Sequence, residues 1–327
     1  MAIRTQQTMT DLARSRTEPS AGSSSATAVH DLTVPPELDG ARLDVALSAL
    51  LHDTTRSAAQ RLIESGRVVL SHGKARPARN VATGLTITVT LEERPPAQLV
   101  PSHRALSIVY QDDDLAVIDK PAGLAVHPGA GSEQETLVHA LLGHDPGIAG
   151  VGDAARPGLV HRLDKDTSGL IAVARTPAAH AALARQWRER RVIKGYQALV
   201  VGHPKAEEGL IDLPIGRDPR NRKRMAPASE GRPARTSYRL VRSYRGFSLL
   251  DLRIETGRTH QIRVHLAALG HPVAGDRLYG GTQAPPGLRR QFLHAYLLGL
   301  YLPSTGEYRE FTSPLPADLQ EVLARLD

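Results

Sequence analysis

The sequence has 327 residues, room for two domains, and its 41 Lys and Arg against 34 Asp and Glu give a formal net charge of +7. This basic excess favours a polyanionic partner such as RNA, DNA or an anionic membrane surface, although it can also serve solubility alone. The absence of cysteine excludes disulfides, thiol catalysis and cysteine-ligated zinc, and it fits a reducing cytoplasm. No apolar run approaches the roughly 20 residues of a membrane span. The N-terminus lacks the apolar segment of a secretory signal.

Residues 1–28 are rich in Ser, Thr and Ala and carry almost no large apolar side chain. Such a segment cannot bury enough apolar surface to compensate for the entropy lost on ordering. We therefore expect a disordered tail there.

The first compact unit, a small α/β unit, is predicted over residues 38–92. Leu43, Leu47 and Leu50 share one face of a helix, and a second helix is expected over residues 56–65. Strands are predicted at 68–70, which is an apolar run, and at 85–90, where apolar and polar residues alternate. Basic residues recur along this unit and form either a polyanion-binding or a merely solvated surface: Arg56, Arg61, Arg67, Lys74, Arg76 and Arg79.

A linker is predicted over residues 93–105, where two prolines stiffen the chain and the strand pattern stops. The second domain spans residues 106–327. It opens with a hairpin of two strands, 107–110 and 115–118, around an acidic turn. Lys120 follows this hairpin, and we expect it to be an exposed strand end.

A polar loop over residues 161–169 lies between two apolar runs, 159–160 and 170–174, which are both expected to be buried strands. The loop contains His, Arg, Asp, Lys, Thr and Ser, the residue types that acid–base chemistry uses. Loops held by rigid strands are frequent places for catalytic residues. The same composition also suits an ordinary turn, so this stretch alone leaves both interpretations open.

The remaining elements are a helix over 177–189 and strands over 194–202 and 247–254, followed by a helix that begins after Thr259 as its N-cap. The basic run from Arg217 to Arg224 is either a solvated loop or a phosphate contact. His260 and His265 are five positions apart, so they do not share a helix face, and no carboxylate completes a metal site. We therefore expect no metal.

Three motifs in the second domain resemble those of the RluA-type pseudouridine synthases. They are His161-Arg-Leu-Asp164 with Thr167-Ser-Gly169, then Lys194-x-Tyr196-x-Ala198-x-Val200-x-Gly202, then Gly257-Arg258-x-His260-Gln261-x-Arg263-x-His265. The first unit resembles the S4-like RNA-binding domain. The resemblance implies an α+β fold in which a mixed, mainly antiparallel, curved sheet has flanking helices and a central cleft.

The resemblance also implies the activity, which is the isomerisation of uridine in RNA to pseudouridine without a cofactor. Asp164 aligns with the catalytic carboxylate, Arg263 with its cationic partner, and Tyr196 with the residue that packs on the uracil. Arg162 aligns with the residue that fills the space left by the flipped base. His161, Arg258, Arg56, Arg67 and Lys74 are further candidates for contacts with the RNA.

Within that family, the S4-like unit and the stretches 156–158 and 214–217 are most similar to members that modify large-subunit ribosomal RNA. We therefore expect a cytoplasmic monomer whose partner is this RNA. The same chemistry on another ribosomal RNA site or on tRNA is the alternative within the family, and two other classes stay open. A glycoside hydrolase could use Asp164 and Asp166 as paired carboxylates, and a decayed enzyme could act as an RNA-binding protein alone.

Overall fold

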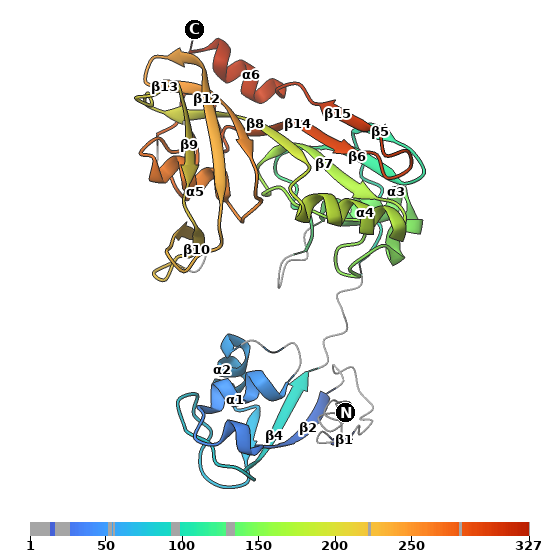
Figure 1. Ribbon diagram of the computed structural model, residues 1–327, viewed down its shortest axis with the longest axis vertical. Coiled ribbons are helices and arrows are strands. Elements are labelled where there is room, and N and C mark those ends of the chain that lie inside the picture. Colours follow the sequence, from blue (N-terminus) through green and yellow to red (C-terminus); the bar gives the residue numbers. More distant parts are fainter. Residues whose placement is uncertain are drawn as a thin grey trace, which may run out of the picture. The chain divides into compact units, whose positions relative to one another are not determined.

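The computed structural model describes residues 14–16, 27–51, 54, 56–92, 99–128, 135–221, 224–280 and 283–326 (Figure 1). The chain divides into two compact units, Met1–Gln98 and Leu99–Asp327, and each is described by itself. None of the helices in these ranges has the length and apolar character that crossing a membrane requires.

The first unit packs two helices on an antiparallel sheet. The helices are α1 (Leu43–Leu50) and α2 (Arg56–Glu64), with a 3-10 turn at Pro36–Leu38. The sheet order is β1-β2-β4-β3, from β1 (Arg14–Arg16), β2 (Thr27–Thr33), β3 (Val68–Leu70) and β4 (Thr86–Glu92). Leu43 and Leu47 are fully buried against Ile87 and Val89, so the predicted helix face does cover the sheet.

The predicted tail over residues 1–28 differs from the structure at two places. Residues 14–16 form β1, and β2 begins at Thr27; the rest of the tail, 1–13 and 17–26, lies outside the described residues. Leu32 and Val34 explain β2, because they alternate with polar residues and are buried in the core of the unit. Once β2 pairs with β4, its other edge offers free backbone groups, and β1 pairs with that edge.

The predicted linker over 93–105 is also shorter than expected. Residues 93–98 lie outside the described residues, whereas Leu99 already packs against the core of the second unit. The backbone N–H of Ser102 donates to the carbonyl of His139, and its hydroxyl contacts Glu135. These contacts attach the end of the predicted linker to the second unit.

The second unit is built on one nine-stranded sheet in the order β5-β6-β7-β14-β8-β13-β12-β9, with β15 paired to β14. Its strands are β5 (Ile108–Gln111), β6 (Leu115–Lys120), β7 (Ser168–Ala174), β8 (Ile193–Val201), β9 (Glu208–Asp212), β12 (Arg235–Tyr244), β13 (Phe247–Ile254), β14 (Leu293–Tyr301) and β15 (Tyr308–Thr312). Only β7 and β14 pair in parallel; every other ladder of this sheet in the described residues is antiparallel. The predicted mixed, mainly antiparallel sheet is confirmed.

Helices flank this sheet. They are α3 (Leu137–His144), α4 (Pro177–Arg188), α5 (Gln261–Ala268) and α6 (Ala317–Ala324), with a 3-10 segment at Pro146–Gly150. In Figure 1, α4 lies across β7, and α5 lies beside β12 and the hairpin of β10 (Ile215–Arg217) and β11 (Met225–Pro227). The predicted basic run, residues 217–224, connects β10 to β11. Its residues 222 and 223 lie outside the described residues.

The stretch 159–160 was expected to be a strand, and this prediction is wrong. Leu159 makes a single bridge to Val173 of β7. Instead of a ladder, two different groups satisfy this edge of β7: the carbonyl of Gly158 accepts from the N–H of Ala174, and His161 Nε2 accepts from the N–H of Ala172. The chain therefore turns away from β7 at the point where the polar loop begins.

Candidate active site

Three elements around the centre of the sheet bring the motif residues together. Asp164 lies in the loop before β7, Tyr196 on β8 and Arg263 on α5, and all three line one cleft of about 760 Å³. The start of β7 pairs with the start of β14, and Gly169 allows this approach. A Cβ at Gly169, whose φ is +116°, would lie 2.2 Å from the carbonyl oxygen of Ala295.

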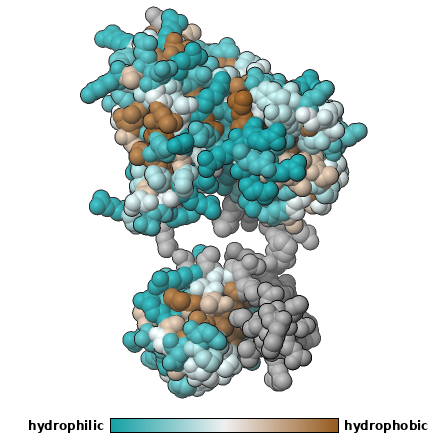
Figure 2. Space-filling model, in the orientation of Figure 1, coloured by the Kyte–Doolittle hydropathy of each residue, from teal (hydrophilic) through white to brown (hydrophobic). Residues whose placement is uncertain are grey.

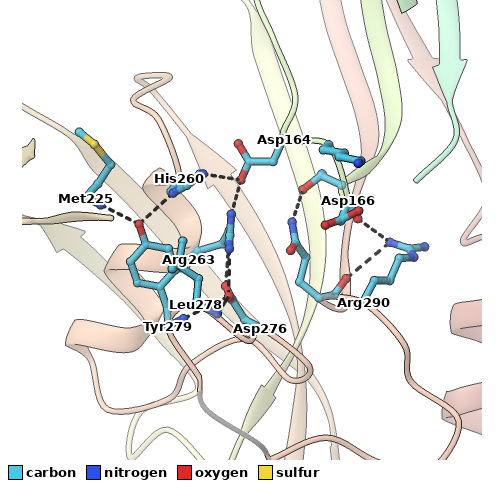
Figure 3. A network of polar contacts seen from close by, with 12 residues as sticks. Asp164, Asp166, Met225, His260, Arg263, Asp276, Leu278, Tyr279 and Arg290 are labelled. Atoms are coloured by element: carbon cyan, nitrogen blue, oxygen red, sulfur yellow. Dashed lines mark hydrogen bonds and ion pairs between the residues drawn. The ribbon is translucent and has the colours of Figure 1, made fainter. Parts of the chain in front are cut away.

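An ion-paired network holds the Asp164 carboxylate (Figure 3). Arg263 Nη1 donates to Asp164 Oδ2 at 2.9 Å, and the same guanidinium binds Asp276 through Nε at 2.6 Å and Nη2 at 2.9 Å. The side chains of Asp276 and Arg263 are 1% and 8% exposed, whereas that of Asp164 is 18% exposed. Arg263 is thus fixed from behind by a buried carboxylate and presents one N–H to Asp164.

The two oxygens of Asp164 have different surroundings. Oδ2 receives the Arg263 bond, and His260 Nε2 lies 3.8 Å from the same oxygen. Among the described residues, Oδ1 has no hydrogen-bond partner, and the residue lines the cleft. One oxygen is therefore anchored and the other is available to a ligand.

Tyr196 forms an apolar wall of the same cleft. Its side chain is 8% exposed, and burial, with the nearby Asp164 charge, raises the pKa of its phenol above the ordinary value of 10.0. The hydroxyl therefore stays protonated at neutral pH. A neutral aromatic ring beside a carboxylate is suited to hold a planar base over that carboxylate.

Basic side chains surround the cleft and give it an affinity for anions. They are Arg156, Arg162, Arg188, Arg190, Lys194 and Arg258. Arg162 is exposed, and Arg258 is half-buried with its Nε bonded to the carbonyl of Pro233. Figure 2 shows that hydrophilic side chains predominate over the visible face of the second unit. The cleft therefore suits a polar, negatively charged substrate.

The main contacts of the His161 side chain are structural and hold the polar loop in place. Its Nε2 is occupied by the N–H of Ala172 at 2.9 Å, and its ring stacks on Trp187 with centroids 4.5 Å apart. Burial lowers the pKa of His161 to about 3, so the imidazole is neutral and can accept this bond. That nitrogen is not available to RNA.

Lys120 was expected to be exposed, and this prediction is wrong. The side chain is fully buried, and its Nζ donates to the carbonyls of Pro121, Leu124 and Lys165 at 2.8, 2.9 and 3.1 Å. Burial lowers its pKa to about 7. Because Lys165 lies in the polar loop and its carbonyl also accepts the N–H of Gly123, Lys120 helps to fix the position of Asp164.

The other side of the loop is fixed by Arg290. Its Nη1 donates to the backbone carbonyl of Asp166 at 3.2 Å (Figure 3), and its Nε pairs with Asp318 of α6 at 2.7 Å. Asp166 itself borders a separate cavity of about 250 Å³, which Asp164 does not line. The two carboxylates therefore do not form the pair that a glycoside hydrolase would need.

No group of three potential metal ligands occurs in the described part of the chain. His260 is directed toward Asp164, whereas His265 bonds through Nδ1 to Thr236 and through Nε2 to the carbonyl of Leu213. The two histidines of the third motif thus have separate environments.

The candidate RNA contacts of the first unit differ from one another. Arg56 lies at the start of α2, and its Nε pairs with the fully buried Asp44 at 3.0 Å. Arg42 and Gln60 donate to the same carboxylate, and the bond from Arg42 is the main reason that the pKa of Asp44 lies below its ordinary value. Arg67 precedes β3 and is half-buried, and Lys74 is exposed in the loop after β3. Arg56 thus has a structural role whether or not it contacts RNA.

The sequence motifs gave no role to Asp276 or Tyr279, although both belong to the site. The structure makes Asp276 the buried partner of Arg263, and it places Tyr279 against both His260 and Arg263. The signal that could have found Asp276 is an acid directly before Arg-Leu-Tyr, with a buried arginine otherwise in need of a second carboxylate.

Comparison with known proteins agrees with this architecture. A family model described as RNA pseudouridylate synthase matches residues 114–268, and one described as S4 domain matches residues 41–87. An uncharacterized RNA pseudouridine synthase from Chloroflexus aurantiacus is 50% identical over 90% of this chain and 93% of its own.

One further sequence relative and one solved structure are similar to this chain. The ribosomal large subunit pseudouridine synthase D of Nitrosomonas europaea is 45% identical over 90% of this chain and 86% of its own. The solved structure of Human RNA Pseudouridylate Synthase Domain Containing 1 is 31% identical, covers 69% of this chain and 96% of its own, and has a TM-score of 0.54.

A cleft with one anchored carboxylate, an aromatic wall and a basic rim defines an enzyme that acts on a nucleic-acid base. The chain belongs to the RNA pseudouridine synthase family, is of the RluA type, and carries an N-terminal S4 domain. It is therefore an isomerase that acts on RNA.

Proposed function

We propose that this enzyme converts uridines of large-subunit ribosomal RNA to pseudouridine, with Asp164 as its catalytic residue. In the reaction the C1′–N1 bond breaks, the uracil turns, and a C1′–C5 bond forms while the C5 proton leaves and N1 gains one. The observation that carries the assignment is the Asp164 carboxylate, which has Oδ2 bound to Arg263 and Oδ1 without a partner among the described residues.

The other roles follow from the geometry of the cleft. Arg263 binds the Asp164 carboxylate in a partly desolvated place, and this charge-assisted bond offsets part of the cost of burying its charge. Tyr196 packs on the uracil. A uridine reaches this cleft only after it leaves its stack, and Arg162, exposed at the cleft, fills the space that the base vacates.

The reaction class is tested by release of tritium. RNA that carries tritium at C5 of uridine loses it to water when the C1′–C5 bond forms. The purified chain should release tritium, whereas a glycoside hydrolase or a non-catalytic RNA-binding protein would release none.

The substrate is supported by several features taken together. The chain carries an S4 domain, and its relative from Nitrosomonas europaea is named for the large ribosomal subunit. Arg220, exposed in the basic segment between β10 and β11, offers a phosphate contact outside the cleft. A loop base is the expected target, because unstacking it costs less than opening a pair.

A strain that lacks this gene is expected to lose pseudouridines from large-subunit ribosomal RNA and to keep those of its tRNA. Mapping pseudouridines in both RNA classes is the measurement. Wild-type protein should restore the sites, and Asp164→Asn protein should not. A strain with every large-subunit site present and one tRNA site missing would show that the substrate is wrong.

Removal of residues 1–98 is expected to weaken RNA binding and site selection but to leave the cleft intact. All residues that we place in the reaction lie in the second unit. The plot of log affinity against log salt should become shallower by roughly 0.7 to 0.9 for each phosphate that the first unit neutralises in the full chain.

The matched control for this deletion is the full chain with Arg67→Gln and Lys74→Gln, which should reproduce part of the change in slope. An unchanged slope in the deletion variant would mean that the first unit does not touch RNA.

We also propose that the enzyme acts as a monomer in the cytoplasm, where ribosomal RNA is modified. Support comes from the cleft itself, since Asp164, Tyr196 and Arg263 all belong to one chain. Light scattering coupled to size-exclusion chromatography should give the mass of one chain, 35.3 kDa.

A further inference from the structure

His260, directly before α5, has an unusual backbone. Its φ is 57° and its ψ is 20°, the left-handed conformation, which only one other non-glycine residue of the described ranges approaches, Arg190. Residues in this conformation persist where their surroundings hold them, and they gather at functional sites. The contacts of the imidazole indicate what the conformation serves.

A chain of hydrogen bonds reaches one nitrogen of the ring. The backbone N–H of Met225 lies 2.8 Å from Tyr279 Oη, and the same oxygen lies 2.8 Å from His260 Nδ1. A backbone N–H can only donate, so Tyr279 accepts from Met225. No other acceptor for the phenolic hydrogen is found among the described residues, so this hydrogen points to Nδ1. An imidazole that accepts at Nδ1 carries its own proton on Nε2.

The surroundings of Nε2 favour the same tautomer, with the proton on Nε2. Nε2 lies 3.8 Å from Oδ2 of Asp164, the oxygen that Arg263 already holds. A carboxylate in front of this nitrogen favours a hydrogen there and opposes a lone pair. Figure 3 shows the imidazole between Tyr279 and Asp164.

The charged groups that face His260 are Asp164 and Arg162 from the polar loop, Arg263 from α5 and Asp276 from the segment after it. Burial is the largest influence and lowers the pKa of His260 below 6.5, while the Asp164 charge raises it and Arg263 lowers it. The ring is therefore neutral at physiological pH and holds one proton.

We propose that His260 is a positioning residue that directs its Nε2–H at Oδ2 of Asp164, and that Tyr279 sets this tautomer. The inference rests on the proposed role of Asp164. At 3.8 Å the contact is longer than a hydrogen bond, and we infer that it closes when a ribose engages Oδ1, as catalytic hydrogen bonds often do. Arg263 and His260 then hold Oδ2 together while the charge of the carboxylate changes.

Tyr279→Phe tests the tautomer, because it keeps the ring that packs on Arg263 and removes only the hydroxyl. Without it, only the Asp164 carboxylate still favours a proton on Nε2, so part of the neutral rings should carry the proton on Nδ1 and turn a lone pair toward Asp164. At pH 8 the single-turnover rate should fall by about twofold or more, in proportion to the fraction of rings that carry the proton on Nδ1. Because burial lowers the pKa of His260, the second proton binds only below pH 6.5; it restores Nε2–H, so the rate should recover there.

A structural role for Tyr279 would lower the rate or raise KM without this recovery. Wild-type enzyme should show no rise in rate as the pH is lowered, and Tyr308→Phe, an exposed tyrosine of β15, is the matched control. Asn suits a left-handed backbone but has no donor at the Nε2 position, so His260→Asn should be slow at every pH. The double variant Tyr279→Phe/His260→Asn should not recover at low pH.

Nitrogen NMR of the RNA-free protein provides a readout independent of activity. His260 should show protonation at Nε2 in wild type and a mixture in Tyr279→Phe. A Tyr279→Phe profile parallel to wild type, or recovery in the double variant, would overturn the inference. An active Asp164→Asn enzyme would instead refute the proposed function and leave the NMR result to stand by itself.

Discussion

Asp164→Asn is expected to abolish pseudouridine formation while RNA binding stays nearly unchanged. The amide keeps the size of the side chain and an oxygen for Arg263, so the network around Asp276 can persist. It removes the negative charge, however, and the other two carboxylates that line the cleft, Asp153 and Glu255, pair with Arg156 and Arg235 instead of with Arg263. Tritium release and a filter-binding affinity measured on the same RNA separate the two effects.

The matched control is Asp166→Asn, two residues further along the same loop. Asp166 is exposed and borders the other cavity, and Arg290 contacts its backbone carbonyl rather than its carboxylate. We expect this variant to keep most of its activity. Turnover near wild type in Asp164→Asn would show that Asp164 is not the catalytic residue. Equal losses of activity in both variants would show that the substitutions disturb the conformation of the loop and not one particular carboxylate.

The resemblance of three motifs to those of the RluA-type synthases was enough to select Asp164, Tyr196 and Arg263, which the fold brings to one cleft. It could not show where the side chains of neighbouring residues point. His161 belongs to the same motif as Asp164, yet its Nε2 turns to the β7 backbone because that strand edge lacks a partner there. Lys120 looked like a surface residue because a lysine is rarely buried, and three carbonyls from two separate segments make its burial possible.

The apolar strand pattern predicted five of the nine strands of the large sheet and missed β9, β12, β14 and β15. Runs such as 247–254 are apolar enough to define a buried strand, and β13 has those bounds. The short run at 159–160 carries the same local signal but lacks a partner strand, which only the fold decides. In the first unit, β2 was missed since its alternation is short and lies beside a stretch of Ser, Thr and Ala.

Arg263→Ala is expected to lower both activity and stability severely. The change leaves Asp276, 1% exposed, and Asp164 without their cation. Breaking a buried ion pair by removing one partner costs about 3–5 kcal/mol, so Tm should fall by roughly 10 °C for a unit of this size. Arg263→Lys keeps the charge but not the bidentate bond to Asp276. Its activity and its Tm should therefore lie between those of the wild type and of Arg263→Ala.

The double variant Arg263→Ala/Asp276→Asn separates the two losses. Asparagine removes the buried charge, and its oxygen can still accept the N–H groups of Leu278 and Tyr279, which Asp276 Oδ1 accepts now. Thermal unfolding should therefore show part of the stability restored. Activity should stay low in the double variant, because Asp164 still lacks the guanidinium that holds its Oδ2. If Arg263→Ala has the Tm and the rate of the wild type, the pair contributes to neither; if the double variant regains activity with stability, Arg263 supports the fold and not the reaction.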